Sequence, residues 1–184
     1  MLRLQYHINH IVNYELISRL NINNIYKIPK KESIIIQSSQ KKLVHDQTLL
    51  YPLYGCFELM SFQRPVFSIS KNAISAYQLR KKQVLGCKTT LRNKYALIFL
   101  DKLIYLYFPK VKALNLYKYK LNQNNINFAF GLNSIIPFED IENQYSKIDM
   151  NFGINVFINF VKYQNINNQN ILLYLSSIQF PIAQ

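Results

Sequence analysis

The chain has 184 residues, a length that suits one domain with a core of ordinary size. It carries 22 Lys and Arg against 9 Asp and Glu, which gives a formal net charge of +13 at pH 7. A surface of this charge repels itself, so the composition favours nucleic acid as a partner over an anionic membrane surface, and over a basic protein with no polyanionic partner.

The first predicted element is a helix from Ile8 to Leu20, because apolar residues recur there on one stripe: Ile8, Val12, Leu16 and Leu20. Glu15 lies four residues before Arg19, which predicts a surface ion pair. The Asn-rich residues 21–24 end this helix. The run of Ile residues within Ser33 to Ser38 predicts a strand that is buried on both faces.

A second helix is predicted within Asp46 to Phe62. Pro52 and Gly55 interrupt this stretch, and a Pro in a helix interior removes a backbone donor and clashes with the preceding turn. We therefore expect only the last turns of this helix to be regular.

The most basic segment of the chain is Gln63 to Arg92. Alternating runs that start at Pro65 and at Gly86 predict two strands, and a long polar loop joins them with four cations: Lys71, Arg80, Lys81 and Lys82. We call Ser68 to Gly86 the finger. In the second strand Lys88, Thr90 and Arg92 share one face, and Cys87, Thr89 and Leu91 share the other. Fixed cations on a projection of this kind suit folded RNA.

A third helix is predicted from Asn93 to Phe108, with Asn93 or Arg92 before its first turn, where Asn caps well. Its apolar residues repeat at helical spacing: Leu97, Leu100, Ile104 and Tyr107. Pro109 ends it, and Asp101 is expected to pair with a nearby Lys or Arg. In Tyr117 to Lys120 aromatic residues and cations alternate, which fits base stacking and a plain edge strand equally well.

The last third of the chain predicts a strand over Phe128 to Glu139, a linker around Ser146 to Asp149 and a further strand from Gly153 to Ile158. A short helix from Asn170 to Ser177 follows, with Asn167 or Asn168 as its cap. The acids Glu139, Asp140 and Glu142 are expected in a solvated turn after a strand end.

This order of elements predicts one domain over residues 1–184 of the α+β class. Its sheet is expected to be mostly antiparallel and five-stranded, with helices packed on one face and a long basic loop between two strands. The other face of the sheet is then free to meet RNA.

No catalytic site is predicted. The sequence has no Gly-rich phosphate loop, no nucleophile beside a His–acid pair and no acid set dense enough for two metal ions, so we expect neither enzyme activity nor a cofactor. Cys56 and Cys87 lie far apart without a Cys-x-x-Cys pair, and His7 and His10 lack further ligands, so no metal site is expected.

Several motifs in the basic segment keep a fixed spacing. They are Gln63-Arg64-Pro65-Val66, then Lys71, Ile74, Tyr77, Leu79 and Arg80, then the strand Leu85 to Arg92. In these residues the chain resembles the universal L-five family of ribosomal large-subunit proteins, which bind 5S rRNA. The resemblance covers nearly the whole chain and is strongest over residues 63–111. Ala76 stands where the family usually has Gly, and Lys81-Lys82 stands where it has an acid-Gly pair, which makes the loop less permissive in its backbone and more positive.

The resemblance implies a structural role in the large ribosomal subunit. Its partners would be large-subunit rRNA in the central protuberance, 5S rRNA where present, P-site tRNA at the finger, and neighbouring ribosomal proteins including one of the small-subunit head. Expected RNA-binding residues, with Tyr77 as a stacking candidate, are Lys30, Lys31, Arg64, Lys71, Tyr77, Arg80, Lys81, Lys82, Lys88 and Arg92.

The composition indicates an organelle origin. Asn, Ile, Lys, Tyr and Phe abound while Gly is scarce and Trp is absent, a bias typical of AT-rich coding sequences. We therefore expect a mitochondrially encoded protein of the mitochondrial ribosome in the matrix. The first residues lack a signal peptide pattern, and the longest apolar stretch, Ala96 to Phe108, contains Asp101 and Lys102, so no membrane insertion is expected.

Two alternatives stay open at this point. An organellar RNA-processing protein, such as an intron nuclease or maturase fragment, would need paired carboxylates near the basic surface. A peripheral membrane protein would need a basic amphipathic helix, whereas the cations here gather in a strand-loop-strand segment.

Overall fold

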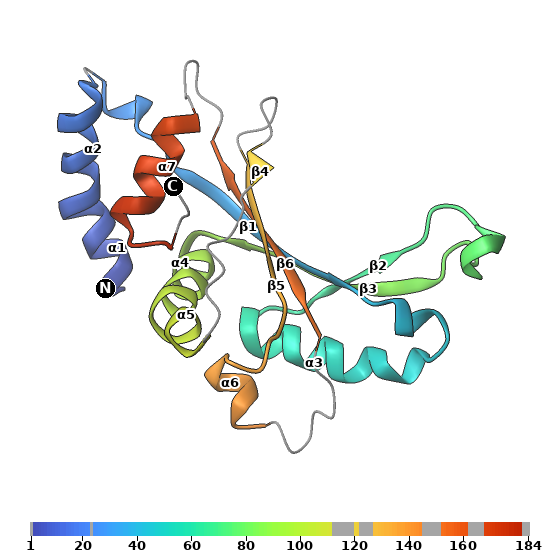
Figure 1. Cartoon of the computed structure of the whole chain (residues 1–184). Helices are drawn as coiled ribbons and strands as arrows, with labels where there is room; N and C mark the ends of the chain where they lie inside the picture. The colour runs from blue at the N-terminus through green and yellow to red at the C-terminus, as the bar shows by residue number, and fades with distance from the viewer. Residues whose placement is uncertain are drawn as a thin grey trace. The chain divides into compact units, whose positions relative to one another are not determined.

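A sheet of six strands, in the order β2-β3-β1-β6-β5-β4, organises the computed structural model of the chain (Figure 1). The structure describes residues 2–22, 24–111, 120–121, 127–144, 152–161 and 168–181. The strands are β1 (Lys31–Ser39), β2 (Val66–Ile69), β3 (Val84–Arg92), β4 (Lys120–Leu121), β5 (Asn127–Leu132) and β6 (Ile154–Phe160). Antiparallel pairing joins β2 to β3 and β4 to β5. The predicted α+β class is confirmed, and the two-residue β4 adds one strand to the five expected.

The chain divides into two compact units. The unit that holds both chain ends, here the terminal unit, comprises Met1–Ile34, Arg92–Phe130 and Phe157–Gln184. The other, here the finger unit, comprises Ile35–Leu91 and Gly131–Val156. Each is described by itself. The predicted Tyr-Lys alternation at 117–119, the Asn-rich turn at 122–126 and the linker at 146–149 lie outside the described residues.

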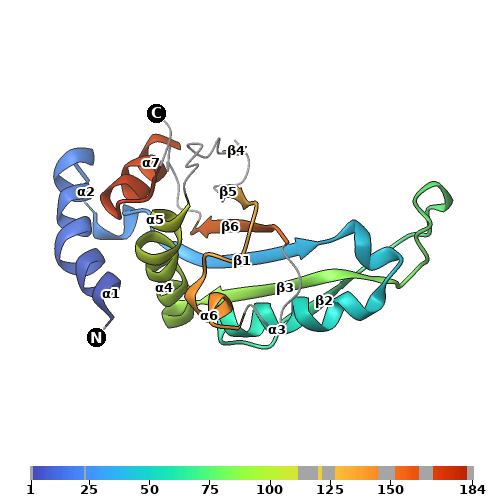
Figure 2. The same cartoon turned by 60° about the horizontal axis from the view of Figure 1, so that its bottom comes forward.

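The N-terminal helix begins earlier than predicted. It runs through α1 (Arg3–His7), a π-helical turn (Ile8–Val12) and α2 (Asn13–Leu20). Leu4 extends the predicted apolar stripe by one turn, and Leu4, Val12 and Leu16 are buried. Asn21 ends the helix in the left-handed conformation (φ 46°), which Asn tolerates well. Figures 1 and 2 both show α2 beside α7 (Asn168–Ser177).

Both predicted ion pairs of the terminal unit are present. Arg19 Nη2 lies 2.6 Å from Glu15 Oε1, one helical turn away. Arg3 Nη2 lies 3.0 Å from Asp101 Oδ1, and the Arg3 guanidinium stacks 3.6 Å from the centre of the Tyr105 ring. Asp101 is thus a structural partner that ties the N-terminal helix to α4 (Asn93–Lys102).

The helix after β3 buries the residues predicted from its spacing. It comprises α4, a π-helical turn (Leu103–Tyr107) and α5 (Phe108–Lys110), and Leu97, Leu100, Ile104 and Tyr107 are all buried. The expected Asn93 cap is wrong: its side chain makes no capping hydrogen bond, and its backbone is left-handed (φ 47°).

Aromatic rings close the core of the terminal unit. The Phe180 ring meets those of Phe108, Phe128 and Phe130 at centroid distances of 5.2, 5.4 and 5.2 Å, all edge-on. Such edge-to-face pairs add to the hydrophobic gain from burial. On β6, Ile154, Val156, Ile158 and Phe160 are buried on one face, as their alternation predicts.

In the finger unit the second helix is continuous, which corrects the prediction of a broken one. α3 runs from Leu50–Ser61 through Pro52 and Gly55. Pro52 is the third helical residue, where backbone N–H groups have no partner within the helix, so its missing donor costs nothing. Buried residues of α3 cover one face of the finger unit: Leu53, Cys56, Phe57, Met60 and Ser61. Figure 2 shows α3 running along β2 and β3.

The predicted strand over Phe128 to Glu139 is too long. β5 ends at Leu132, and Glu139–Glu142 form a short helix, α6, that packs against α3. The acids expected in a solvated turn therefore occupy the first turn of a helix, where negative charge is favourable.

Strand β3 approaches its neighbour β1 unusually closely at Gly86. A Cβ atom on Gly86 would lie 1.9 Å from the backbone oxygen of Ser38. Any side chain there would force the two strands apart, so Gly86 permits this pairing of β3 with β1.

We expect Gly86→Ala to lower the free energy of unfolding by about 1–3 kcal/mol, since the clash is with backbone and cannot be relieved by a side-chain rotation. Gly55→Ala is the matched control. Nothing lies within 4 Å of a Cβ on Gly55, which is in α3, so Ala there is expected to stabilise the protein by about 0.5–1 kcal/mol. Urea unfolding measures both. Equal effects of the two substitutions would refute the role given to Gly86.

Candidate nucleic-acid interface

Two residues, Ser70 and Gln83, close the base of the finger. Ser70 N donates to Gln83 O (2.9 Å), Gln83 N donates to Ser70 Oγ (3.1 Å), and Ser70 Oγ donates to the carbonyl of Arg80. Gln83 Nε2 also donates to Val44 O (2.9 Å), which fastens the finger to the segment before α3. The basic residues between β2 and β3 thus stand on a backbone held by its own hydrogen bonds.

The far end of the finger forms a second, smaller closure. Ile74 and Leu79 exchange two backbone hydrogen bonds of 3.1 Å around a 3₁₀ turn, Ser75–Tyr77. Gln78 (φ 56°) and Lys82 (φ 66°) are left-handed. Lys82 stands where the family resemblance led us to expect Gly, so a lysine occupies a backbone conformation that glycine adopts without steric cost.

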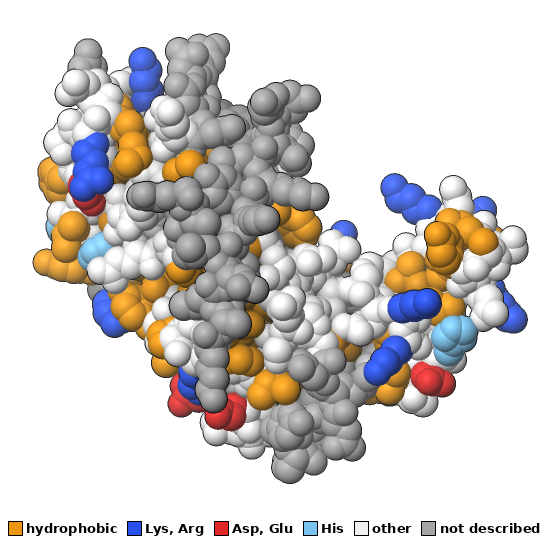
Figure 3. All heavy atoms as spheres, in the orientation of Figure 1, with side chains coloured by type: hydrophobic (Ala, Val, Ile, Leu, Met, Phe, Trp, Pro, Cys, Tyr) orange, Lys and Arg blue, Asp and Glu red, His pale blue; other side chains and the backbone are white. Residues whose placement is uncertain are grey.

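The predicted site residues of the finger are all exposed: Lys71, Tyr77, Arg80, Lys81 and Lys82. Tyr77 is 69% exposed, so its ring face is accessible to a base. Figure 3 shows Lys and Arg side chains around this end of the finger, with hydrophobic side chains among them. A groove of about 800 Å³ lies at its side, between His45 and the cations Arg80, Lys81 and Lys82.

Strand β3 carries the predicted two faces. Lys88, Thr90 and Arg92 are exposed, whereas Cys87, Thr89 and Leu91 are buried. Burial raises the pKa of the Cys87 thiol to about 11, so this cysteine is a neutral core residue at neutral pH. Arg64, just before β2, is also exposed. Lys88 is the cross-strand partner of Val66, which is 60% exposed, so this open face mixes cationic and apolar side chains.

The remaining predicted residues belong to the terminal unit, which holds Lys30, Lys31 and Arg92. Lys30 is exposed and Lys31 is half-buried. The cations thus form one group in each unit, and the finger unit holds the larger: Arg64, Lys71, Arg80, Lys81, Lys82 and Lys88.

Comparison with known proteins decides the family. The model for the C-terminus of the ribosomal L-five family, also named uL5, matches residues 84–182. The chain is 33% identical over 141 residues to the large ribosomal subunit protein uL5 of Mycoplasma pneumoniae, which covers 77% of this chain and 78% of that protein. It is 30% identical over 158 residues to uL5m of Reclinomonas americana (86% and 87%), and 29% identical over 170 residues to uL5 of Baumannia cicadellinicola (92% and 91%).

The chain belongs to the ribosomal uL5 family. Membership makes it a structural protein of the large ribosomal subunit and not an enzyme. This overturns the alternative of an intron nuclease or maturase fragment. No helix of the described residues is long and apolar enough to cross a membrane.

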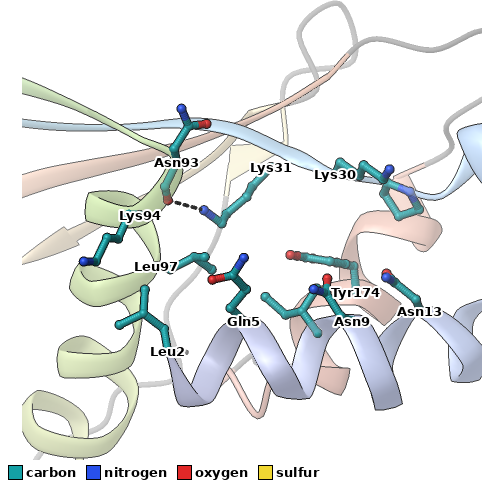
Figure 4. Close-up of a pocket in the computed structure, with 12 residues that line it drawn as sticks. Leu2, Gln5, Asn9, Asn13, Lys30, Lys31, Asn93, Lys94, Leu97 and Tyr174 are labelled. Carbon is teal, nitrogen blue, oxygen red and sulfur yellow. Dashed lines mark hydrogen bonds between the residues drawn. The ribbon is translucent and has the colours of Figure 1, made fainter.

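The match to the uL5 family model begins at Val84, so it takes in β3 with its exposed cations Lys88 and Arg92. Sequence reasoning missed other polar residues of the terminal unit. Lys94 lines the same cavity as Lys30 and Lys31, together with the amides of Gln5, Asn9 and Asn13 (Figure 4). The four-residue spacing of these amides on the predicted helix was a usable signal, but a polar helix face is ordinarily just solvated.

Lys31 is the cation of this family member most affected by its surroundings. Burial lowers its pKa from the usual 10.5 to about 8, because desolvation disfavours the ammonium form. Its Nζ donates to Asn93 O at 3.4 Å. Between pH 8 and 10.5 the unfolded chain therefore binds more protons at Lys31 than the folded chain, and the stability contributed by this group rises with pH.

We expect Lys31→Met to raise the free energy of unfolding at neutral pH by roughly 1–3 kcal/mol, because the buried charge is removed and the chain length is kept. The gain should shrink as the pH rises from about 8 towards 10.5, where the folded wild-type protein already holds Lys31 neutral. Urea unfolding at several pH values tests this. Lys27→Met, at an exposed position, is the control. A gain that does not change with pH would rule out desolvation as its cause.

Proposed function

We propose that the chain is a constituent of the large subunit of a mitochondrial ribosome, where it binds rRNA in the central protuberance. The RNA is 5S rRNA or the region that replaces it. The observation that carries this proposal is the finger, whose exposed cations stand on a backbone closed by Ser70 and Gln83. Prepositioned cations bind a polyanion with little loss of conformational entropy.

The proposed RNA contacts are mainly with phosphate. The residues are Lys30, Lys31, Arg64, Lys71, Arg80, Lys81, Lys82, Lys88 and Arg92, with Tyr77 stacking on an exposed base. Lys and Arg contacts to phosphate position a protein on folded RNA by shape and carry little base specificity. The chain charge of +13 supports the same reading.

The finger is proposed to approach the P-site tRNA. Its far end combines the exposed ring of Tyr77 with Lys81 and Lys82, a pairing of aromatic and cationic groups that suits a structured RNA surface. The acid-bearing helix α6 (Glu139, Asp140 and Glu142) is proposed to contact a protein of the small-subunit head, because acidic side chains are poor partners for RNA.

A mitochondrial location is supported by two observations. The uL5m relative of Reclinomonas americana is similar over 86% of this chain, and the composition has the bias of AT-rich coding sequences. We further propose that residues 1–184 behave as one domain, so that heat or urea unfolds both units in one transition.

Salt dependence tests the phosphate contacts. We expect Arg80→Ala and Lys81→Ala each to weaken binding to ribosomal RNA fragments and to flatten the slope of log affinity against log salt by about one. Lys27→Ala removes an exposed cation outside the proposed site and should leave the slope unchanged. Filter binding at several salt concentrations gives the slopes. An unchanged slope for Arg80→Ala would remove that residue from the interface.

Location in the ribosome is tested by sedimentation of a mitochondrial lysate on a sucrose gradient, with the chain detected before and after a high-salt wash. We expect stoichiometric, salt-resistant sedimentation with the large subunit, and release on RNase treatment. Sedimentation with membranes, or recovery at the top of the gradient, would contradict the proposed function.

A further inference from the structure

A cavity of about 810 Å³ opens in the terminal unit (Figure 4). The N-terminal helix forms one wall, α4 and α7 form others, and the residues that lead into β1 close it from the opposite side. This volume lies within the range of small-molecule sites, about 300–1,000 Å³. The residues around it come from four separate parts of the chain, so the cavity exists only in the folded unit.

One wall of the cavity is a row of amides. Gln5, Asn9 and Asn13 follow one another at intervals of four residues, which puts them on one face of the N-terminal helix. Figure 4 shows the Gln5 and Asn9 side chains pointing into the cavity. Each amide offers two donors and an acceptor, the groups that pair with the edge of an unstacked base.

The opposite wall is cationic. Lys31 points into the cavity, and Lys30 and Lys94 line it as well. An ammonium has three donors, and Lys31 uses one on the Asn93 carbonyl. The N-terminal helix contributes only amides and apolar groups to the lining, and α7 contributes Tyr174.

No carboxylate among the described residues lines this cavity. The acids of the surrounding elements are engaged or face elsewhere. Glu15 is paired with Arg19 and Asp101 with Arg3, while Glu32 follows Lys31 on β1 and therefore points to the other face of that strand. The cavity thus presents uncompensated positive charge, and an anion is the complementary ligand.

Apolar groups complete the lining. Leu2, Ile8, Pro29 and Leu97 border the cavity, and the Tyr174 ring reaches it with its hydroxyl directed inwards. Tyr174 is held by an edge-on contact with Phe160, with ring centroids 5.6 Å apart at 86°. A flat ligand with an apolar face, a polar edge and an anionic group matches these three kinds of wall.

We propose that this cavity binds one unpaired nucleotide of an RNA strand, with its phosphate at Lys31 and Lys94 and its base edge at the amides of Gln5 and Asn9. The inference rests on the proposed RNA-binding function and adds to it a site that discriminates between bases. The finger cations contact phosphate and cannot do so.

The site also predicts a dependence on pH. Lys31 titrates near pH 8 in the free protein, and a bound phosphate favours its protonated form, so affinity should be constant below this pH and fall above it. The other titratable groups that face the cavity are Lys30, Lys94 and Tyr174, and burial raises the pKa of Tyr174 well above its usual value, which keeps its hydroxyl neutral. Lys31→Arg should therefore bind without this loss, because the guanidinium does not titrate.

The experiment uses the full chain labelled with ¹⁵N, and follows the side-chain amide signals of Gln5, Asn9 and Asn13. The probes are AMP, CMP, GMP and UMP, inorganic phosphate, and single-stranded RNA octamers of each base. We expect amide shifts that depend on the base, and octamers of the preferred base to bind at least about tenfold more tightly than its monophosphate, since flanking phosphates add contacts.

Matched variants locate the site. Lys31→Met should weaken octamer binding about tenfold, whereas Lys27→Met should leave it nearly unchanged. Asn9→Leu should abolish the difference between bases while phosphate still binds, and both variants are checked for folding by their backbone spectra. Fluorescence anisotropy with the preferred octamer at a pH of about 7 and about 9 tests the titration of wild type against Lys31→Arg.

Several outcomes would overturn the inference. Inorganic phosphate that reproduces the amide shifts without any base dependence would show an anion site only. Monophosphates that bind when octamers do not would indicate a free nucleotide. Unmoved amide signals would leave the cavity without a nucleotide. If wild type still sediments with the large subunit in any of these cases, the nucleotide site alone has failed. Base-dependent binding without sedimentation would instead contradict the ribosomal function.

Discussion

The two-faced strand β3 is the constraint on which the finger unit depends. Its buried residues join the core over α3, while Lys88, Thr90 and Arg92 face outwards. The strand can serve both purposes only because it lies against β1 without a side chain at Gly86, where a Cβ would meet the Ser38 carbonyl. A slip of one residue would bury the cations and expose the core face, so the hydrophobic effect that holds the strand also orients its charges.

The finger shows how a short polar clamp can take the place of a core. It has few buried side chains, and its cations would repel one another on a loose chain. Ser70 and Gln83 close its base through backbone and side-chain hydrogen bonds, and Gln83 also reaches Val44. Lys82 adds a charge at a left-handed position, where the backbone would favour Gly. The finger unit has accepted this local strain in exchange for more positive charge towards the proposed RNA.

The terminal unit treats its cations differently. Lys31 is held in a cavity, where burial lowers its pKa to about 8, instead of on an open surface. A buried ammonium weakens the isolated protein but binds an anion more strongly, because the surrounding low dielectric increases the attraction. A ribosomal protein that is always assembled with RNA can keep such a group, since the complex and not the free chain must be stable.

The sequence by itself determined the features that depend on local spacing. The helical stripe through Val12 and Leu16, the Glu15–Arg19 pair and the alternation along β3 were predicted correctly, because neighbouring residues set the face on which a side chain lies. The continuity of α3 was not, since the effect of Pro52 depends on where packing starts the helix. Only the tertiary structure decided the desolvation of Lys31 and its meeting with distant residues, because burial is set by every element that surrounds a group.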